Sequence, residues 1–296
     1  MFDKLKSLGV LGDAKPATPA EAAQPQLAYA QAHTIPDSRA QKLSVAGFEL
    51  EGCSIAGQET CIIVPRAKVV FDIGRCPQRA VFQQTVLISH GHLDHVGGLP
   101  FHVSSRGLNS LPPSKIVLPP SYTEGDDELQ LPSGFTVKPL ATTHGIESQG
   151  YVLYSLRKKL KAELQGRGQE DIKQLRLGGM DVQETIKVPE IAFTADTTVE
   201  FLERDSPALA DALRARLLII EMTFVDDTVS VDEARERGHL HIADFIVHAH
   251  RFQNEAILLI HFSARYKRSE IINALNTNLP PSLRAKCVPF LNGYAD

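Results

Sequence analysis

Four side chains of the metal-ligand type lie within six positions of this sequence: His90, His92, Asp94 and His95. They follow the apolar run 86–88, which predicts a buried strand. Neutral imidazoles and carboxylates are the ligands that Zn²⁺ and similar borderline ions prefer. The alternative is a histidine-rich surface turn, which a position directly after a buried strand disfavours. The spacing therefore indicates a metal site at the end of this strand.

Three further candidates follow apolar runs: His144, Asp196 and His261. Taken singly, a histidine after a strand is more often a hydrogen-bonded structural residue, and an aspartate before a helix is more often a cap. Their shared placement at strand ends favours the interpretation that they complete a site with two metal ions.

The elements that must position these residues alternate in a regular way from residue 43 onward. Short β-branched runs predict strands at 60–64, 68–72, 85–89, 115–118, 151–155, 190–194, 217–221 and 256–261. Helical patterns lie at 207–214, 231–237, 242–252 and 267–275. Early strands follow one another closely, while later strands alternate with helices. This order predicts an α/β layered fold with sheets inside and helices outside.

Residues 1–42 differ from the rest of the chain because Ala, Pro and Gln dominate them without apolar periodicity. Such a segment buries too little surface to offset its ordering entropy, so we expect a disordered extension before a catalytic domain at 43–296. It lacks the apolar core of a secretory signal, and its four acidic residues disfavour a transit peptide. We expect a cytoplasmic protein, with a chloroplast or another organelle as the alternative if 1–42 act as a transit peptide.

Composition excludes several classes of protein. The chain has 296 residues, 31 Lys and Arg, 35 Asp and Glu, and a net charge of −4, which argues against a general polycation. No apolar run is long enough to span a membrane. The four cysteines form no Cys-x-x-Cys pair, which fits a reducing compartment and excludes a thiolate zinc site of that kind.

One segment departs from this acidic average. Residues 156–176 contain seven basic and three acidic residues, a net charge of +4. The basic residues are Arg157, Lys158, Lys159, Lys161, Arg167, Lys173 and Arg176. Gly166 and Gly168 interrupt the segment, which predicts two short helices joined by a flexible tip. Charge alone would equally allow a solvated helix pair.

The ordered motifs resemble those of the metallo-β-lactamase superfamily: residues 90–95, His144, the Phe-Thr-Ala-Asp-Thr segment at 193–197, and His261. The Asp-x-Gly at 72–74 also matches, and its Asp72 supports the metal loop in that superfamily. The resemblance covers about 43–296. It implies an αββα sandwich of two sheets flanked by helices.

Within the superfamily, three features resemble the tRNase Z family. They are His-x-Ser-x-Arg-Tyr at 261–266, the paired segments 221–224 and 238–241, and the basic segment between the His144 and Asp196 motifs. The family carries a flexible arm there, which grips the tRNA elbow. Segments 57–63 and 71–77 are most similar to the short, plant-type form. The usual Pro-x-Lys-x-Arg-Asn loop is absent, and residues 57–64 occupy its place.

The resemblance implies a site with two Zn²⁺ ions per subunit, for which Mn²⁺ or other divalent ions are alternatives. It assigns His90, His92 and His144 to one ion, and Asp94, His95 and His261 to the other, with Asp196 bridging them. Asp94 would also orient or deprotonate the attacking water.

Two further catalytic assignments follow from the same resemblance. His239 would be the general acid, and Glu221 would orient it and raise its pKa. The alternatives are an interior salt bridge for Glu221 and a helix cap for His239.

The implied activity is a zinc-dependent endoribonuclease that removes the 3′ trailer from precursor tRNA, leaving a 3′-hydroxyl on the tRNA and a 5′-phosphate on the trailer. A homodimer is implied, in which the arm of one subunit serves the active site of the other; no membrane association is expected. One alternative is a metallo-β-lactamase-fold phosphodiesterase or thioesterase acting on a small molecule. Another is a non-catalytic tRNA-binding subunit.

Overall fold

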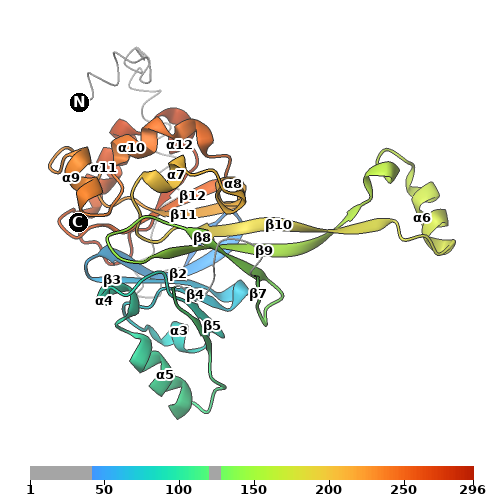
Figure 1. Cartoon of the computed structure of the whole chain (residues 1–296), viewed down its shortest axis with the longest axis horizontal. Helices are drawn as coiled ribbons and strands as arrows, with labels where there is room; N and C mark the ends of the chain where they lie inside the picture. The colour runs from blue at the N-terminus through green and yellow to red at the C-terminus, as the bar shows by residue number, and fades with distance from the viewer. Residues whose placement is uncertain (1–41, 120–127) are drawn as a thin grey trace.

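The computed structural model describes residues 42–119 and 128–296. Except for Lys42, the extension predicted at 1–42 lies outside the described residues. Two seven-stranded sheets face each other, helices cover their outer faces, and a long ribbon projects from the body (Figure 1). The predicted αββα sandwich with an inserted arm is therefore confirmed. None of the described helices is long and apolar enough to cross a membrane.

The first sheet is built from strands between residues 43 and 117, with one short strand added from residues 262–263. Its strand order is β1-β2-β3-β4-β5-β6, and β13 pairs with β2 in parallel. The strands are β1 (Leu43–Val45), β2 (Phe48–Ala56), β3 (Glu59–Val64), β4 (Val69–Phe71), β5 (Thr85–Leu87), β6 (Lys115–Val117) and β13 (Phe262–Ser263). The short η1 (Pro65–Ala67) and the helices α3 (Gln78–Val81), α4 (Leu93–Val96) and α5 (Leu99–Leu108) connect its strands.

The second sheet has the order β14-β12-β11-β10-β9-β8-β7. The strands are β7 (Leu129–Gln130), β8 (Thr136–Ala141), β9 (Gln149–Leu160), β10 (Gln183–Phe193), β11 (Leu217–Glu221), β12 (Ala256–Ile260) and β14 (Cys287–Pro289). Helical segments on this half are α7 (Glu200–Glu203), α8 (Pro207–Arg214), α9 (Val231–Glu236), α10 (Ile242–Val247), η3 (Ala249–Arg251), α11 (Arg268–Asn278) and α12 (Pro281–Arg284).

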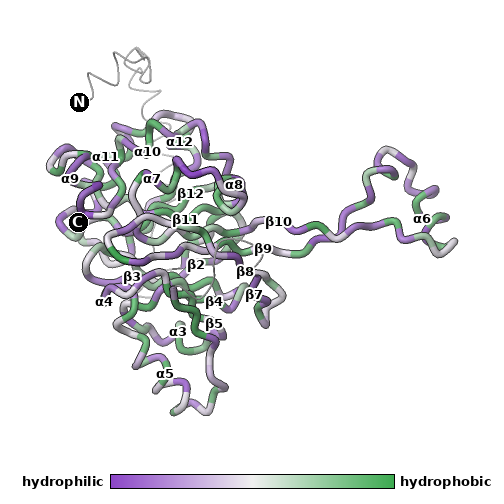
Figure 2. Tube along the Cα trace, in the orientation of Figure 1, coloured by the Kyte–Doolittle hydropathy of each residue, from purple (hydrophilic) through white to green (hydrophobic). Residues whose placement is uncertain are grey.

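The core lies between the sheets and beneath the helices. Phe71 of the first sheet stacks on Phe193 of the second, with ring centroids 4.7 Å apart. Strands β11 and β12 are nearly continuous apolar runs because parallel strands in the middle of a sandwich are buried on both faces. Figure 2 shows the hydrophobic residues concentrated on these central strands and mainly hydrophilic residues along the ribbon.

All eight predicted strands and four predicted helical segments are present, although the helix predicted at 242–252 divides into α10 and η3. The prediction for 156–176 was wrong in its first half. Strand β9 continues to Leu160 and pairs with β10 down to Gln183, so the stem of the arm is an antiparallel ribbon. Only the end of the arm is helical, with η2 (Ala162–Leu164) and α6 (Gln169–Leu177), and Leu164 and Val182 are buried there.

Candidate metal centre and active site

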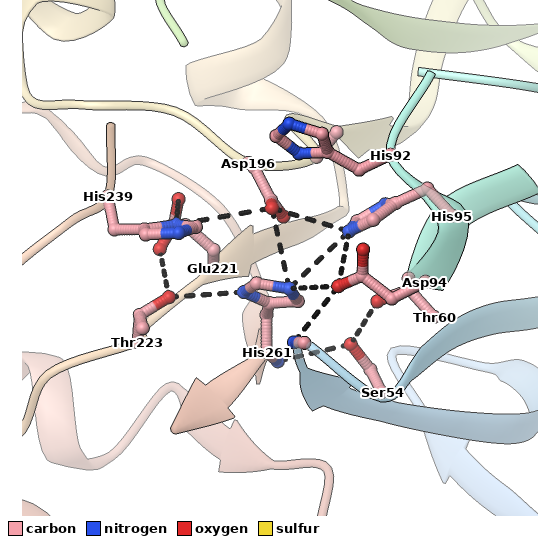
Figure 3. Close-up of polar contacts among 12 residues, drawn as sticks. Ser54, Thr60, His92, Asp94, His95, Asp196, Glu221, Thr223, His239 and His261 are labelled. Carbon is pink, nitrogen blue, oxygen red and sulfur yellow. Dashed lines mark hydrogen bonds and ion pairs between the residues drawn. The ribbon is translucent and has the colours of Figure 1, made fainter. Parts of the chain in front are cut away.

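The seven predicted ligands converge from both sheets onto one site. His90, His92, Asp94 and His95 lie on the loop after β5 and on α4, while His144, Asp196 and His261 follow β8, β10 and β12. Their ligand atoms form three groups that could each hold a metal ion; one is His90, His95 and Asp196, and the other two match the predicted assignment. Of the two that match, the first group is His90, His92 and His144, and the second group is Asp94, His95 and His261. Several of these side chains point toward one another around Asp196 (Figure 3).

The first group presents imidazole nitrogens at short range. Nδ1 of His92 lies 3.0 Å from Nε2 of His90 and 3.3 Å from Nε2 of His144. Nδ1 of His144 donates a hydrogen bond to the carbonyl oxygen of Gly238 at 2.8 Å. This bond fixes the tautomer that leaves Nε2 of His144 with a lone pair for a metal ion.

The second group is arranged in the same way. Nε2 of His95 and Nε2 of His261 lie 3.4 Å apart, and each lies 3.6 Å from Oδ2 of Asp94. The remaining nitrogens have other partners: Nδ1 of His95 lies 2.7 Å from Oδ2 of Asp72, and Nδ1 of His261 lies 3.1 Å from Oγ1 of Thr223. Both rings are therefore oriented by groups outside the candidate ligands.

Asp196 lies between the two groups. Its Oδ2 is 3.3 Å from Nε2 of His95, 3.4 Å from Nε2 of His261 and 3.8 Å from Nε2 of His90. Its Oδ1 is buried and has no hydrogen-bond partner among residues 42–119 and 128–296. A buried carboxylate oxygen without a partner is costly, and a bound cation would remove that cost. The donor set therefore fits divalent ions, with Asp196 placed to be shared.

Protonation of the cluster follows from burial and neighbouring charge. Burial and the nearby His95 lower the pKa of His90 to about 3, and burial lowers the pKa of His144. Both imidazoles are thus neutral at pH 7, as ligands must be. Burial also opposes charge on His95, but the carboxylates of Asp196 and Asp72 outweigh it and raise its pKa. The same carboxylates would stabilise a bound metal cation.

Strained backbone accompanies three of the strand ends. Asp72, Ala195 and His261 have φ values of 55°, 57° and 58°, in the left-handed region that residues other than glycine seldom adopt. Asp72 also accepts hydrogen bonds from the Ser89 backbone N–H and Oγ, both at 2.7 Å. The reversed backbone turns the chain at the site, and packing and hydrogen bonds hold it there.

Sequence reasoning missed several supporting groups. Ser54 accepts a hydrogen bond from the His261 backbone N–H at 3.1 Å, and its hydroxyl pairs with that of Thr60 (Figure 3). No local pattern links Ser54 to a histidine 207 positions away. Ser89 directly precedes His90, and Thr223 lies in the Glu-Met-Thr-Phe motif. A hydroxyl residue beside each motif was therefore the only sequence signal that could have indicated these two supporting groups.

Glu221 and His239 form a second buried pair beside the ligands. Nδ1 of His239 lies 3.1 Å from Oε1 of Glu221 and 4.0 Å from Oδ2 of Asp196. Burial opposes protonation of His239, but the charge and hydrogen bond of Glu221 outweigh it and raise the pKa of His239 to about 9. His239 is therefore protonated near neutral pH and can donate a proton. It also lies in a group with His144 and Asp196 that could hold an ion.

The predicted RNA-binding residues lie together on the arm, away from the ligands. Arg157, Lys158 and Lys159 are on β9, Lys161 and Arg167 flank η2, and Lys173 and Arg176 are on α6. Figure 1 shows this arm extending well clear of the body. Arg157 forms an ion pair with Glu190 and Lys173 one with Glu170, so two of the seven have acidic neighbours.

Residues 83–236 match the metallo-beta-lactamase superfamily. The chain is 42% identical over 277 residues to tRNase Z TRZ1 of Arabidopsis thaliana, covering 85% of this chain and 98% of that relative. The chain belongs to the tRNase Z family. It is also 41% identical to tRNase Z TRZ2, chloroplastic, of the same plant, with 85% of this chain and 77% of the relative covered. The crystal structure of human tRNase Z, short form, aligns with a TM-score of 0.44 at 19% identity, over 72% of this chain and 92% of that one.

Membership of the tRNase Z family confirms the resemblance that the ordered motifs indicated. The metallo-beta-lactamase match spans the loop at 90–95, His144, Asp196 and Glu221, and ends before His239 and His261. The relatives at 41–42% identity extend the match over 85% of the chain.

Proposed function

We propose that this protein is a metal-dependent endoribonuclease that removes the 3′ trailer from precursor tRNA. The observation that supports it best is a basic arm inserted between the His144 and Asp196 elements of a histidine and aspartate centre, in a member of the tRNase Z family. Residues 43–296 are proposed as one catalytic domain, with the RNA-binding arm around 156–176 within it.

The proposed metal is zinc, two ions per subunit. His90, His92 and His144 would hold one ion, Asp94, His95 and His261 the other, and Asp196 both; Mn²⁺ or another divalent ion suits the same donors. When bound, the two ions would stabilise charge developing on the phosphoryl oxygens and make the attacking water more acidic.

The side chains then perform the proton transfers. Burial raises the pKa of Asp94, but the hydrogen bond from His261 and the charges of His95 and His261 outweigh it and lower the pKa to about 2, so the carboxylate is ionised at neutral pH. Oδ2 of Asp94 accepts a hydrogen bond from the Gly57 backbone N–H at 2.9 Å, and the carboxylate would orient or deprotonate the attacking water.

His239 would complete the reaction at the leaving group. As the water oxygen bonds to phosphorus, the bond from phosphorus to the 3′-oxygen of the tRNA breaks, and His239 protonates that oxygen. The products are a tRNA with a 3′-hydroxyl and a trailer with a 5′-phosphate.

The arm would supply binding energy at a distance. Contacts from lysine and arginine to phosphates are independent of base sequence and sensitive to salt. RNA helices are recognised largely by shape, and the elbow of a tRNA has a fixed shape. The seven basic residues of 156–176 are proposed to contact it.

A homodimer is also proposed, with the arm of one subunit serving the site of the other. The family resemblance and the projection of the arm away from its own body support this arrangement (Figure 1). Sedimentation should give a particle of twice the 32.5 kDa chain mass, and a particle of one chain mass would contradict it.

The cytoplasm is the proposed compartment because 1–42 carry four acidic residues. The relative named as chloroplastic supports the organelle alternative. Fusing residues 1–42 to a fluorescent protein distinguishes the two, since import into plastids would contradict the cytoplasmic assignment.

A cleavage assay tests the activity. Precursor tRNA with a 3′ trailer, incubated with the protein and Zn²⁺ or Mn²⁺, should yield the two products above. A variant with residues 157–186 replaced by Asn-Gly joins β9 and β10 where Leu156 faces Lys187, and it should lose this cleavage. No trailer release by the full-length protein would refute the proposal. A small-molecule hydrolase would be unaffected by loss of the arm.

A further inference from the structure

Glu190 occupies an irregular position where the arm leaves the body. In the pairing of β10 with β9, Pro189 lies opposite Tyr154 and Ile191 lies opposite Leu153, so Glu190 is an extra residue without a cross-strand partner. This is a β-bulge, which bends the strand that carries it. Residues 191–193 beyond it are buried in the body, whereas the arm side of the ribbon is mostly exposed.

The carboxylate of Glu190 is nearly buried, with a side-chain exposure of 4%. Its Oε1 accepts hydrogen bonds from Ser155 Oγ and from Nη2 of Arg157, both on the neighbouring strand β9. Its Oε2 lies 3.4 Å from Nη1 of Arg216, which directly precedes β11 in the body. One carboxylate therefore joins both strands of the ribbon to the body.

Arg216 is itself held firmly. Its Nη2 donates to the Ala46 carbonyl at 2.8 Å, its Nε donates to Glu255 at 3.0 Å, and its guanidinium carbon lies 5.3 Å from the centroid of the Phe48 ring. Arg216 thus contacts the first sheet as well as Glu255, which directly precedes β12. A carboxylate fastened to it cannot move independently of the body.

We propose that Glu190, together with Arg157 and Arg216, forms an ion-pair anchor, here called the arm anchor, that fixes the direction of the arm relative to the active site. This inference rests on the proposed function, in which the arm must place a tRNA at a set distance from the metal centre. For Arg157 alone among the seven basic residues, this inference replaces the tRNA contact proposed above: Arg157 would be a positioning residue that acts through Glu190.

The charge of Glu190 supports a positioning role. A carboxylate at the base of an RNA-binding arm repels the substrate, and burying it is costly unless it is paired. Its hydrogen bonds and its ion pairs with Arg157 and Arg216 hold its pKa below the ordinary value despite burial, so it stays ionised at neutral pH. An arm with a fixed direction loses less conformational entropy when it binds, which is a benefit that charge alone does not give.

The test compares Glu190→Gln and Arg157→Ala with a matched control, Lys159→Ala. Lys159 lies on the same strand, and within residues 42–119 and 128–296 the structure shows no ion pair for it. Kinetics on precursor tRNA are measured over a range of salt concentrations, together with hydrolysis of bis(p-nitrophenyl) phosphate. Hydrogen exchange reports amide protection in the ribbon at 156–160 and 183–188.

Glu190→Gln should raise KM for precursor tRNA about tenfold, the effect of losing roughly one charged hydrogen bond. Its kcat and its hydrolysis of the small diester should stay within about twofold, and ribbon amides should lose protection while β11 and β12 keep theirs. Arg157→Ala should raise KM without changing the salt slope. Lys159→Ala should reduce that slope by about one, as loss of a phosphate contact does.

Four results would contradict these proposals. If Glu190→Gln leaves KM unchanged or lowers it, the arm anchor is refuted, because removing a negative charge alone favours RNA binding. If Glu190→Gln leaves the amide protection of the ribbon unchanged, the arm anchor is refuted as well. If Arg157→Ala reduces the salt slope as Lys159→Ala does, Arg157 contacts phosphate. Failure of the unmodified protein to cleave precursor tRNA would refute the proposed function instead, and hydrogen exchange would still test the arm anchor.

Discussion

Oε1 of Glu221 lies 3.1 Å from Nδ1 of His239, and the same oxygen accepts a hydrogen bond from the Thr197 backbone N–H at 2.6 Å. Thr197 follows Asp196, so a single fully buried carboxylate joins the loop of a candidate ligand to the candidate general acid. The other oxygen of Glu221 accepts from Thr223 Oγ1 and from the Leu240 N–H. The position of His239 is therefore coupled to that of the metal centre.

Replacing His239 with Ala should lower kcat for precursor tRNA by about 10²–10⁴-fold, the usual contribution of a general acid. Bis(p-nitrophenyl) phosphate has a leaving group that needs no proton, so its hydrolysis should fall far less. The measurement is kcat on both substrates together with zinc content. An equal loss on both substrates with a loss of zinc would identify His239 as a ligand instead.

Replacing Asp196 with Ala should disrupt both proposed metal positions, because its Oδ2 approaches imidazoles of both groups. We expect two zinc ions per chain in the unmodified protein and fewer than one in the variant, measured by elemental analysis after dialysis. Chelation should abolish cleavage by the unmodified protein, and Zn²⁺ or Mn²⁺ should restore it. One zinc ion per active chain would contradict the proposed pair.

Gly74 packs where no side chain fits. A Cβ at this position would lie 1.8 Å from the Asp94 carbonyl oxygen, whereas a Cβ at Gly91 would have no atom of the described part of the chain within 4 Å. We expect Gly74→Ala to destabilise the fold by about 1–3 kcal/mol or more, as overpacking does, and to reduce zinc content. Gly91→Ala, in the metal loop after β5, should change neither, and thermal unfolding with metal analysis compares the two variants. Normal zinc content in Gly74→Ala would show that the loop position tolerates displacement.

His102 should make stability depend on pH. Burial, with the nearby charge of Arg106, lowers its pKa from 6.5 to about 4 in the folded protein. The unfolded chain therefore binds more protons below pH 6.5, so this part of the stability is complete above pH 6.5 and is lost as the pH falls toward 4. His102→Gln should flatten the slope of the unfolding free energy by up to about 1.4 kcal/mol per pH unit in that window.

The control for this experiment is His250→Gln, which removes an exposed histidine. Its slope between pH 6.5 and 4 should match that of the unmodified protein in denaturant titrations. Equal slopes for the His102 variant and the unmodified protein would show that His102 does not titrate in this way.

Mixed dimers test whether arms act between subunits. His92→Ala has an arm but a damaged site, and the variant with 157–186 replaced has a site but no arm. Each alone should be inactive on precursor tRNA. Mixed in equal amounts after dissociation, they should recover roughly a quarter of normal activity, because half of random dimers contain both chains and one working site. No recovery in a mixture shown to contain both chains would mean that each arm serves its own subunit.

The metal loop was predictable because its information is local. Four candidate ligands lie within six positions after a buried strand, and a strand end fixes where they point. The orienting groups were not predictable: Ser54 contacts His261 across 207 positions, and the fold alone brings them together. The helix-cap alternative for His239 also illustrates this limit, since the side chain that caps α10 is that of His241.

Strands β1, β2, β7, β8, β13 and β14 were not predicted, and the helical prediction at 157–160 was wrong; β2 and the ribbon at 157–160 show two physical reasons. Strand β2 contains Gly52, which normally signals a turn, but here φ is 120° and a Cβ would lie 1.8 Å from the Cys61 carbonyl oxygen. The ribbon at 157–160 has no apolar alternation because much of it faces water, and its strands are held by pairing with residues about 25 positions later. Neither cause is visible in a local window of sequence.

The two strands of the arm remain paired where they leave the body, so its entry and exit points are neighbours in space. Insertions between such neighbouring points change little in the host structure. Recombination could therefore exchange one arm for another in a single event, and a lineage could acquire new RNA targets while its hydrolytic chemistry stayed unchanged. The paired stem of the arm thus allows the substrate range to change independently of the reaction.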